Sequence, residues 1–276
     1  MNNLVSIIIP TKNSAEFFEN CLRSINEQTY KDIEIIVIDS HSIDKTIYLA
    51  KKYKCKIYTY TPKLKRGSFD ASIKRNYGVK KSKGKYIYWV DADMELSKKL
   101  IEETVDKCKL GADAIILPED SFGTGMWARA KNLERRCYWG DNTVESPRFF
   151  KRVVWDNIGG FDESLGAGGD DFDLHRKCLE KGYKVERTKN IVMHNEGNLS
   201  LRKLIKKHFM YGRDVLKYFQ KRPKASLISY SPIRLAYIRN YKLFLSRPID
   251  ACSFIIMRTT ENLAGIIGIL YSFIDN

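Results

Sequence analysis

The first sixty residues alternate short apolar runs with amphipathic segments. Apolar runs at residues 4–9, 33–38 and 55–60 predict strands, and residues 15–28 and 42–53 follow a helical spacing. Strands that alternate with helices favour βαβ units and a mostly parallel sheet covered by helices on both faces. Because such sheets bind ligands beyond the carboxyl ends of their strands, polar residues that follow the strands are expected to gather at one edge.

Three predicted strands end in such polar residues. Pro10, Thr11 and Asn13 follow the first strand, Asp39 follows the second, and the apolar run 86–90 leads into Asp91-Ala92-Asp93. In extended backbone, alternate side chains leave the same face roughly 6.5–7 Å apart. Two carboxylates placed in this way can face a divalent cation and the phosphates that it bridges. Alternatively, they only cap the next helix.

The pattern continues to about residue 197. A helix at 68–81 holds Arg75 near its middle, and further segments are predicted as a helix at 96–110, a strand at 114–117, a strand and helix start at 148–155 and a strand at 184–192. Residues 119–145 are polar and aromatic, which predicts a long loop with helical parts. Asp170 and Asp171 open a helix that ends near residue 181, and His194 follows the last strand.

The character of the chain changes near residue 198. The net charge of the chain is +15, and residues 198–276 hold 14 Lys and Arg against 4 Asp and Glu, a net +10. Residues 201–219 form an apolar helical stripe with basic residues away from it, a pattern typical of a membrane-surface or partner-binding helix. We therefore expect an α/β domain at 1–197 and a helical, basic and apolar extension at 198–276, with an anionic partner.

Cysteine spacing and hydropathy bear on the location of the protein. The six cysteines form no Cys-x-x-Cys pair, which argues against a zinc knuckle and favours reduced thiols in the cytoplasm. Residues 4–9 are too short for a signal peptide. The apolar stretch 263–274 is 12 residues long, whereas a membrane span needs about 20. We expect no spanning helix, and a peripheral contact with the membrane stays open.

Seven motifs stand in an order and at a spacing similar to a known family. They occupy residues 5–13, 34–46, 75–78, 84–93, 159–163 and 169–174, with His194 last. The chain resembles the family 2 glycosyltransferases, which are inverting enzymes of the GT-A fold that use nucleotide-diphosphate sugars. The resemblance extends from about Val5 to His194 and implies a GT-A domain with a Rossmann-like sheet.

The resemblance also implies a role for each motif residue. The nucleotide base and ribose would be held by Pro10, Thr11, Asn13 and Asp39, and the donor phosphates would lie near Arg75. Asp91 would contact ribose or sugar, Asp93 would bind Mg²⁺ or Mn²⁺, and His194 would be the second protein ligand of the metal. Ala92 and Asp170 complete the implied donor-binding set, and Asp171 would be the general base.

Some positions depart from the commoner family pattern. Lys12 stands where an aromatic residue is frequent, Asp70 and Ser72 precede Arg75, and Ser40-His41 replaces a second acidic residue. These differences leave the nucleotide, UDP or GDP or another, undecided.

The acidic pair Asp170-Asp171 bears on the acceptor. A hydroxyl must lose its proton as it attacks, whereas a lipid phosphate is already ionised, so a candidate base favours a hydroxyl acceptor. With the basic tail, this predicts an enzyme on the cytoplasmic face of an anionic membrane that extends a lipid-linked saccharide. The main alternative is a polyprenyl-phosphate sugar synthase.

Three other functions fit the sequence less well. A sugar-phosphate nucleotidyltransferase would carry a Gly-rich, basic phosphate loop after the first strand, and residues 10–13 are not such a loop. Nucleic-acid binding by the basic tail lacks a base-reading motif, so no nucleic-acid partner is expected. An inactive scaffold would not be expected to keep Asp91, Asp93, Asp171 and His194 together.

Overall fold

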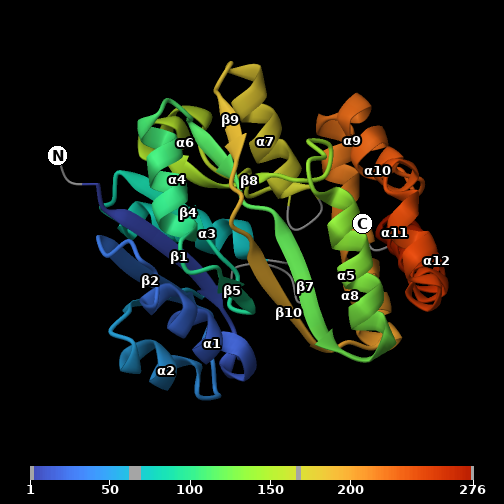
Figure 1. The fold of residues 1–276 in the computed structure, drawn as a ribbon, viewed down its shortest axis with the longest axis horizontal. Coiled ribbons are helices and arrows are strands. Elements are labelled where there is room, and N and C mark those ends of the chain that lie inside the picture. The colour runs from blue at the N-terminus through green and yellow to red at the C-terminus, as the bar shows by residue number, and fades with distance from the viewer. Residues whose placement is uncertain (1–2, 62–69, 166–168, 275–276) are drawn as a thin grey trace.

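A seven-stranded sheet forms the centre of the computed structural model, which describes residues 3–61, 70–165 and 169–274 (Figure 1). Its strands run in the order β3-β2-β1-β4-β8-β6-β9, and β8 is antiparallel to both of its neighbours. The strands are β1 Val5–Thr11, β2 Ile33–Asp39, β3 Lys56–Thr59, β4 Tyr86–Trp89, β6 Ala114–Ile116, β8 Pro147–Lys151 and β9 Val185–Arg187. The predicted α/β class with a mostly parallel sheet is confirmed.

Helices cover both faces of this sheet. They are α1 Ala15–Asn26, α2 Thr46–Lys52, α3 Ala71–Lys81, α4 Leu100–Lys109, α6 Arg152–Ile158 and α7 Asp170–Glu180. One apolar core joins Ile7 and Ile9 to α1 and α4, and a second joins Ile8 to α3, α6 and α7. Because alternate residues of β1 enter opposite cores, the strand reads as a continuous apolar run. The predicted start of α3 at residue 68 lies outside the described residues.

A small second sheet corrects two predictions. Strands β5 Met94–Leu96, β10 Val192–Asn198 and β7 Glu119–Thr124 pair in the order β5-β10-β7. The loop with helical parts predicted at 119–145 is confirmed only in its helical part, α5 Gly125–Tyr138, because strand β7 was not expected there. The strand predicted at 184–192 is wrong, since that segment splits into β9 and the start of β10. The pairings of β10 with β5 and with β7 join segments about seventy or more residues apart in the sequence. Local periodicity does not reveal such pairings.

Strand β1 continues through Pro10 to Thr11, where the apolar pattern suggested a stop. The ladder between β1 and β4 ends at Ile8 and Trp89, while the ladder with β2 continues to Thr11 and Asp39. Pro10 is therefore paired on one side only, so its missing N–H is tolerated there.

Five helices follow residue 200: α8 Leu201–Lys221, α9 Pro223–Ser229, α10 Leu235–Arg239, α11 Tyr241–Ser246 and α12 Pro248–Ser272. Helix α12 lies along α8 and also contacts α5 (Figure 1). In the described part of the chain, α12 is the one helix long and apolar enough to cross a membrane, although core helices of soluble proteins also meet this criterion. Helix α12 is longer than the apolar stretch 263–274 that the sequence showed. The charged residues Arg258 and Glu261 interrupt the apolar pattern, but the helix continues through them.

A buried ion network fixes α12 to α5 and α8. Glu261 is fully buried, and its carboxylate lies 2.6 Å from Arg258, 3.3 Å from Lys131 of α5 and 3.2 Å from His208 of α8. A buried carboxylate is costly unless cations surround it, and removing one partner of such a group typically costs about 3–5 kcal/mol. The polar side of α12 therefore faces the protein.

The α8–α12 contact also depends on glycine and predicts a difference between two alanine substitutions. A Cβ at Gly212 would lie 2.1 Å from the Gly265 carbonyl oxygen, whereas a Cβ at Gly265 would lie 3.9 Å from its nearest neighbour. We expect Gly212→Ala to lower the midpoint of thermal unfolding, because overpacking costs about 1–3 kcal/mol. Gly265→Ala should leave it unchanged or raise it, since alanine is the better helix former. Equal melting temperatures for the two variants would contradict this packing.

Candidate active site

The loops after β1 and β2 are joined at the edge where the sequence predicted them. Thr11 Oγ1 donates to Asp39 Oδ1 at 2.8 Å. The Ser42 backbone N–H donates to the other oxygen of Asp39 at 2.8 Å, and Ser42 Oγ accepts from the Asn13 N–H at 2.7 Å. The structure thus brings Pro10, Thr11, Asn13 and Asp39 together.

Asn13 closes this corner through an unusual backbone conformation. Its φ of +50° lies in the left-handed region, which asparagine tolerates better than most residues. Its Oδ1 accepts from the Ile43 N–H at 2.9 Å, so the loop after β1 is fastened to the loop after β2. The pair of loops presents a rigid polar rim at the carboxyl ends of the strands.

The segment Asp91-Ala92-Asp93 is a turn, which corrects the expectation of extended backbone. Strand β4 ends at Trp89, and the Met94 N–H donates to the Asp91 carbonyl at 3.1 Å before β5 begins. The chain turns here because β5 belongs to the second sheet. The two carboxylates consequently have different partners.

Asp91 lies between two arginines. Arg75 Nη2 donates to Oδ1 at 2.6 Å and Arg148 Nη1 to Oδ2 at 3.3 Å. Both guanidinium carbons lie over the Trp89 ring, 4.1 and 4.0 Å from its centroid, a geometry worth about 0.5–2 kcal/mol per cation. Burial alone would raise the pKa of Asp91, but the two guanidinium charges outweigh it and hold that pKa well below its ordinary value. Asp91 is therefore a permanent anion.

Asp93 lies against His194 on the other side of the turn. Asp93 Oδ2 is 3.1 Å from His194 Nε2, and the Asp93 carbonyl accepts from the Asn195 N–H at 2.8 Å. The strand register explains the contact, because His194 is paired with Met94, the residue next to Asp93. His194 thus lies inside β10, where the sequence placed it after a strand, and the predicted proximity to Asp93 is present.

Three residues that the sequence analysis did not single out, Arg148, Glu119 and Arg135, connect the two aspartates. Glu119 accepts from Arg148 Nε at 2.6 Å and from Arg135 Nη1 at 2.6 Å. Arg135 Nη2 then donates to His194 Nδ1 at 3.0 Å. Burial raises the pKa of Glu119, but Arg148 and Arg135 bring it down to about 2. A continuous chain of contacts therefore runs from Asp91 through Arg148, Glu119, Arg135 and His194 to Asp93.

The donor atoms around Asp93 fit a divalent cation bound together with a diphosphate. Asp93 Oδ1 is buried and no described protein group pairs with it. Within the described residues, no set of three or more His, Cys, Asp or Glu is grouped as a metal site. Two protein ligands suit Mg²⁺ or Mn²⁺ that takes its other oxygen ligands from phosphates and water.

The imidazole of His194 has a preferred tautomer in this arrangement. Arginine can only donate, so Nδ1 accepts from Arg135 and a neutral ring carries its proton on Nε2, toward Asp93. To bind a metal through Nε2, the ring must carry its proton on Nδ1 instead. Glu196, whose Oε1 lies 3.9 Å from Nδ1, is a carboxylate near that proton but beyond hydrogen-bond distance in this structure.

Asp170 and Asp171 occupy the first turn of α7, which α8 holds in place. Gly169 precedes them with φ +108°, and a Cβ there would lie 2.5 Å from the Tyr218 ring of α8. Asp173, fully buried, is held by Arg222 Nε at 2.9 Å and by Lys221 Nζ at 2.9 Å. The start of α7 is thus positioned by the helices after residue 200.

The two aspartates have different partners. Asp170 accepts from the Ser72 hydroxyl and lies 3.6 Å from Arg75 Nη1, so the structure brings it next to the Arg75–Asp91 pair. Among the described residues, Asp171 Oδ1 is hydrogen-bonded only to the Phe172 N–H, at 2.9 Å. Burial and then the neighbouring Asp170 carboxylate raise the pKa of Asp171 to about 6. A carboxylate with that pKa can take up a proton near neutral pH.

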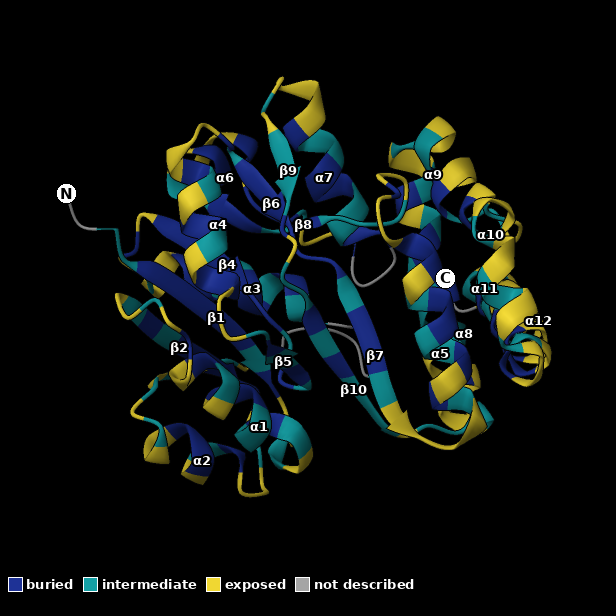
Figure 2. Ribbon diagram, in the orientation of Figure 1, coloured by how far each residue is buried: buried dark blue, intermediate teal, exposed yellow. Residues whose placement is uncertain are grey.

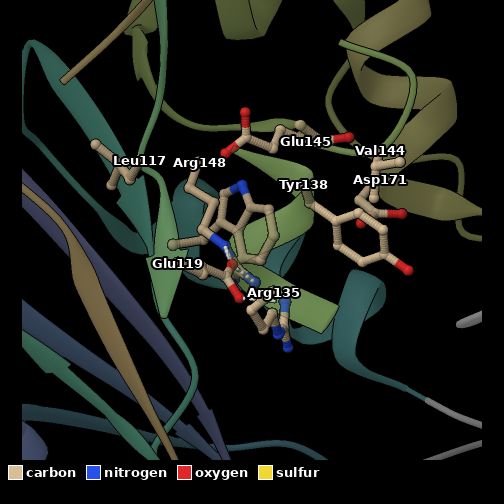
Figure 3. Close-up of a pocket in the computed structure, with 10 residues that line it drawn as sticks. Leu117, Glu119, Arg135, Tyr138, Val144, Glu145, Arg148 and Asp171 are labelled. Atoms are coloured by element: carbon tan, nitrogen blue, oxygen red, sulfur yellow. Dashed lines mark hydrogen bonds and ion pairs between the residues drawn. The ribbon is translucent and has the colours of Figure 1, made fainter. Parts of the chain in front are cut away.

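A pocket beside Asp171 contains most of the residues that the sequence analysis missed (Figure 3). Its lining is Trp89, Leu117, Glu119, Arg135, Tyr138, Val144, Glu145, Ser146, Arg148 and Asp171. Arg148 gave one usable signal, since a charged residue next to the apolar pair Phe149-Phe150 inside a strand needs a partner for its charge. Glu119, Arg135 and Glu145 lay in the segment predicted as a loop.

Comparison with known proteins agrees with this architecture. The family model described as Glycosyl transferase family 2 matches residues 6–177. The poly(ribitol-phosphate) beta-N-acetylglucosaminyltransferase TarP of Staphylococcus aureus is 30% identical over 168 residues, 55% of this chain and 50% of that protein. The uncharacterized glycosyltransferase YibD of Escherichia coli is 34% identical over 119 residues, 40% of this chain and 34% of that protein. The chain thus matches half or less of these curated relatives.

Solved structures share the fold along nearly the whole chain. Mannosyltransferase PcManGT from Pyrobaculum calidifontis, in complex with GDP-Man and Mn²⁺, aligns with a TM-score of 0.62 and 17% identity over 97% of this chain and 87% of that one. S. aureus TarS 1–349 with UDP aligns with a TM-score of 0.54 and 15% identity over 99% of this chain and 92% of that one. These structures confirm the expected GT-A fold. Because the family model covers more than half of the residues of the chain, the chain belongs to glycosyl transferase family 2.

Proposed function

We propose that this glycosyltransferase moves a sugar from a UDP or GDP sugar to a hydroxyl acceptor, with inversion at the anomeric carbon and with Mg²⁺ or Mn²⁺. One observation carries the proposal. Asp93 has one oxygen without a protein partner and lies beside His194. Arg135 donates to His194 and also lines the pocket that contains Asp171. A metal–diphosphate site and a candidate base therefore share one region.

The chemistry assigns a task to each side of this region. The bond between the anomeric carbon and the diphosphate oxygen breaks with its electron pair on the diphosphate, while the acceptor oxygen bonds to the opposite face of the carbon. Asp171 takes the hydroxyl proton, which a raised pKa favours. Bound Mg²⁺ or Mn²⁺ supplies charge stabilisation for the departing diphosphate. The loops of Thr11, Asn13 and Asp39 hold the nucleotide, and Asp91 with Arg75 orients the ribose or sugar.

The relatives suggest where to look for the donor. PcManGT was solved with GDP-Man and Mn²⁺, and TarS was solved with UDP-GlcNAc. We therefore propose one of these two donor classes for this chain. A polyprenyl-phosphate sugar synthase stays the main alternative, since its acceptor is a phosphate that needs little help from a base.

The surface after residue 226 supports an acceptor carried on membrane lipid. Seventeen of the twenty-five exposed large apolar side chains of the described residues lie between Leu227 and Ile274. Figure 2 shows exposed positions recurring along α9 to α12. Arg239 and Lys242 are exposed among them and Lys224 is exposed just before them, which suits anionic lipid headgroups. We propose that this surface rests on the cytoplasmic face of the membrane.

The ion network of Glu261 favours a helix that lies on the membrane over one that crosses it. Glu261 and Arg258 are near the middle of α12 and are paired with α5 and α8. Insertion of α12 across the bilayer would place these charges in the hydrocarbon layer and break their pairing, at a cost of at least several kcal/mol.

The donor is tested by a screen of nucleotide sugars. UDP-GlcNAc and GDP-mannose come first, each with Mg²⁺, Mn²⁺ or chelator, and a membrane extract or a polyprenyl phosphate serves as acceptor. We expect release of one nucleoside diphosphate that requires metal, and loss of that release in Asp93→Asn. Release of equal rate in chelator would contradict metal dependence, and transfer to polyprenyl phosphate alone would favour the alternative.

The base is tested by substitution and by pH. Asp171→Asn should lower the transfer rate by about 10²–10⁴-fold with little change in donor affinity. Because the base acts in its ionised form, the rate of the wild type should rise with pH through about 6. Asp106→Asn, at the surface of α4, is the matched control. Retained turnover in Asp171→Asn, or a flat profile between pH 5 and 8, would remove Asp171 from this role.

Membrane contact is tested by flotation of the full chain with anionic vesicles. Ile267→Glu and Leu270→Glu place charges on the exposed side of α12 and should abolish flotation together. Leu110→Glu replaces an exposed apolar residue just after α4, away from this surface, and should have no effect. Equal flotation of the α12 double variant and the wild type would exclude this surface.

A further inference from the structure

The pocket beside Asp171 holds an unusual concentration of unpaired polar atoms. Among the described residues, eleven buried side-chain nitrogen or oxygen atoms have no hydrogen-bond partner in the protein. Four of them belong to residues that line this pocket: Trp89 Nε1, Arg135 Nε, Glu145 Oε1 and Ser146 Oγ. Buried polar atoms without a partner each cost about 1–3 kcal/mol, so four around one cavity need an explanation.

Glu145 is the most telling of the four. Its side chain is only 9% exposed, and its Oε2 is well paired, with Arg187 Nε at 2.7 Å and the Gly140 N–H at 2.9 Å. These two contacts fix the carboxylate and leave Oε1 without a protein partner. The protein therefore builds a rigid hydrogen-bond acceptor at the pocket.

The cations of the pocket lining are already paired within the protein. Arg135 and Arg148 are both paired with Glu119, and Glu145 is paired with Arg187. No described cation of the lining is left over for an anionic ligand. What remains is hydrogen-bonding capacity: donors at Trp89 and Arg135, an acceptor at Glu145, and a hydroxyl at Ser146 that does both.

The remaining lining is apolar or aromatic. Leu117 and Val144 contribute side chains, and the Tyr138 hydroxyl is occupied by Glu134 and Tyr237, each at 2.6 Å. Figure 3 shows Glu145, Asp171 and Arg135 around the same group of side chains, with the Tyr138 ring on the side of Asp171. Apolar rings beside fixed donors and acceptors match a ligand with C–H faces and several hydroxyl groups.

We propose that this pocket is the subsite for the acceptor, that it takes a neutral sugar ring or polyol, and that Glu145 and Ser146 select its hydroxyl groups. The assignment rests on the proposed function, because Asp171 at its wall is the candidate base for the attacking hydroxyl. Glu145 and Ser146 are specificity residues, and the hydroxyl groups they bind are not the one that reacts.

The test measures binding of neutral glycosides to the full chain with Mn²⁺ and UDP or GDP present. The probes are the methyl glycosides of glucose, galactose, mannose and N-acetylglucosamine, and ribitol, titrated by calorimetry or by saturation-transfer NMR. At least one should bind the wild type, and Ser146→Ala and Glu145→Gln should each weaken it about tenfold, as expected for a lost buried hydrogen bond. Ser246→Ala, whose exposed hydroxyl bonds to the Leu243 carbonyl, is the matched control.

Measurements of thermal stability and of donor affinity distinguish an acceptor subsite from the other roles that this pocket could have. The Ser146 hydroxyl has no protein partner, so Ser146→Ala should melt at or above the wild-type temperature, and neither variant should change the Kd of the nucleoside diphosphate. If the diphosphate binds but no probe does, or if the variants bind the probe as the wild type does, the subsite is wrong. If the variants weaken the nucleotide sugar but not the free diphosphate, the pocket belongs to the donor sugar. Failure of the wild type to bind any nucleoside diphosphate would instead overturn the proposed function.

Discussion

The pairing of Asp91 with two arginines over Trp89 is the interaction on which the site depends. A carboxylate at the end of a buried strand is costly unless cations reach it, and here Arg75 comes from α3 and Arg148 from β8. The same Arg148 continues through Glu119 and Arg135 to His194, which lies on Asp93. Five separate segments of the chain are thereby held in one arrangement around a three-residue turn.

Asp91 and Asp93 are only two residues apart in the sequence, yet this arrangement gives their carboxylates different partners. Asp91 has both oxygens engaged by cations, whereas Asp93 keeps one buried oxygen without a protein partner. The helices after residue 200 matter to the same site, because Tyr218 packs on Gly169 and Arg222 holds Asp173. A tail that contacts the membrane in the proposed way would therefore bear directly on the helix that carries Asp171.

The sequence predicted the parts of the site that follow from local pattern. Apolar runs ending in polar residues placed Thr11, Asn13, Asp39 and Asp91 at one sheet edge, and the contacts of Thr11 with Asp39 confirm that proximity. The turn at Asp91–Asp93 and the strand position of His194 were missed, because both depend on pairing between β5 and a strand about a hundred residues away. Glu119 and Arg135 were missed for the same reason, since β7 acquires its partner β10 only in the folded chain. The roles assigned to these residues stay predictions.

We propose that the metal binds together with the diphosphate rather than alone, because Asp93 and His194 are the two protein ligands that the described residues offer. Electron paramagnetic resonance of Mn²⁺ measures this directly, because free and bound Mn²⁺ give different signals. We predict weak binding of Mn²⁺ to the wild-type protein, binding at least tenfold tighter once UDP or GDP is added, and loss of the increase in Asp93→Asn. Equal Mn²⁺ affinity with and without nucleoside diphosphate, or an undiminished increase in Asp93→Asn, would contradict it.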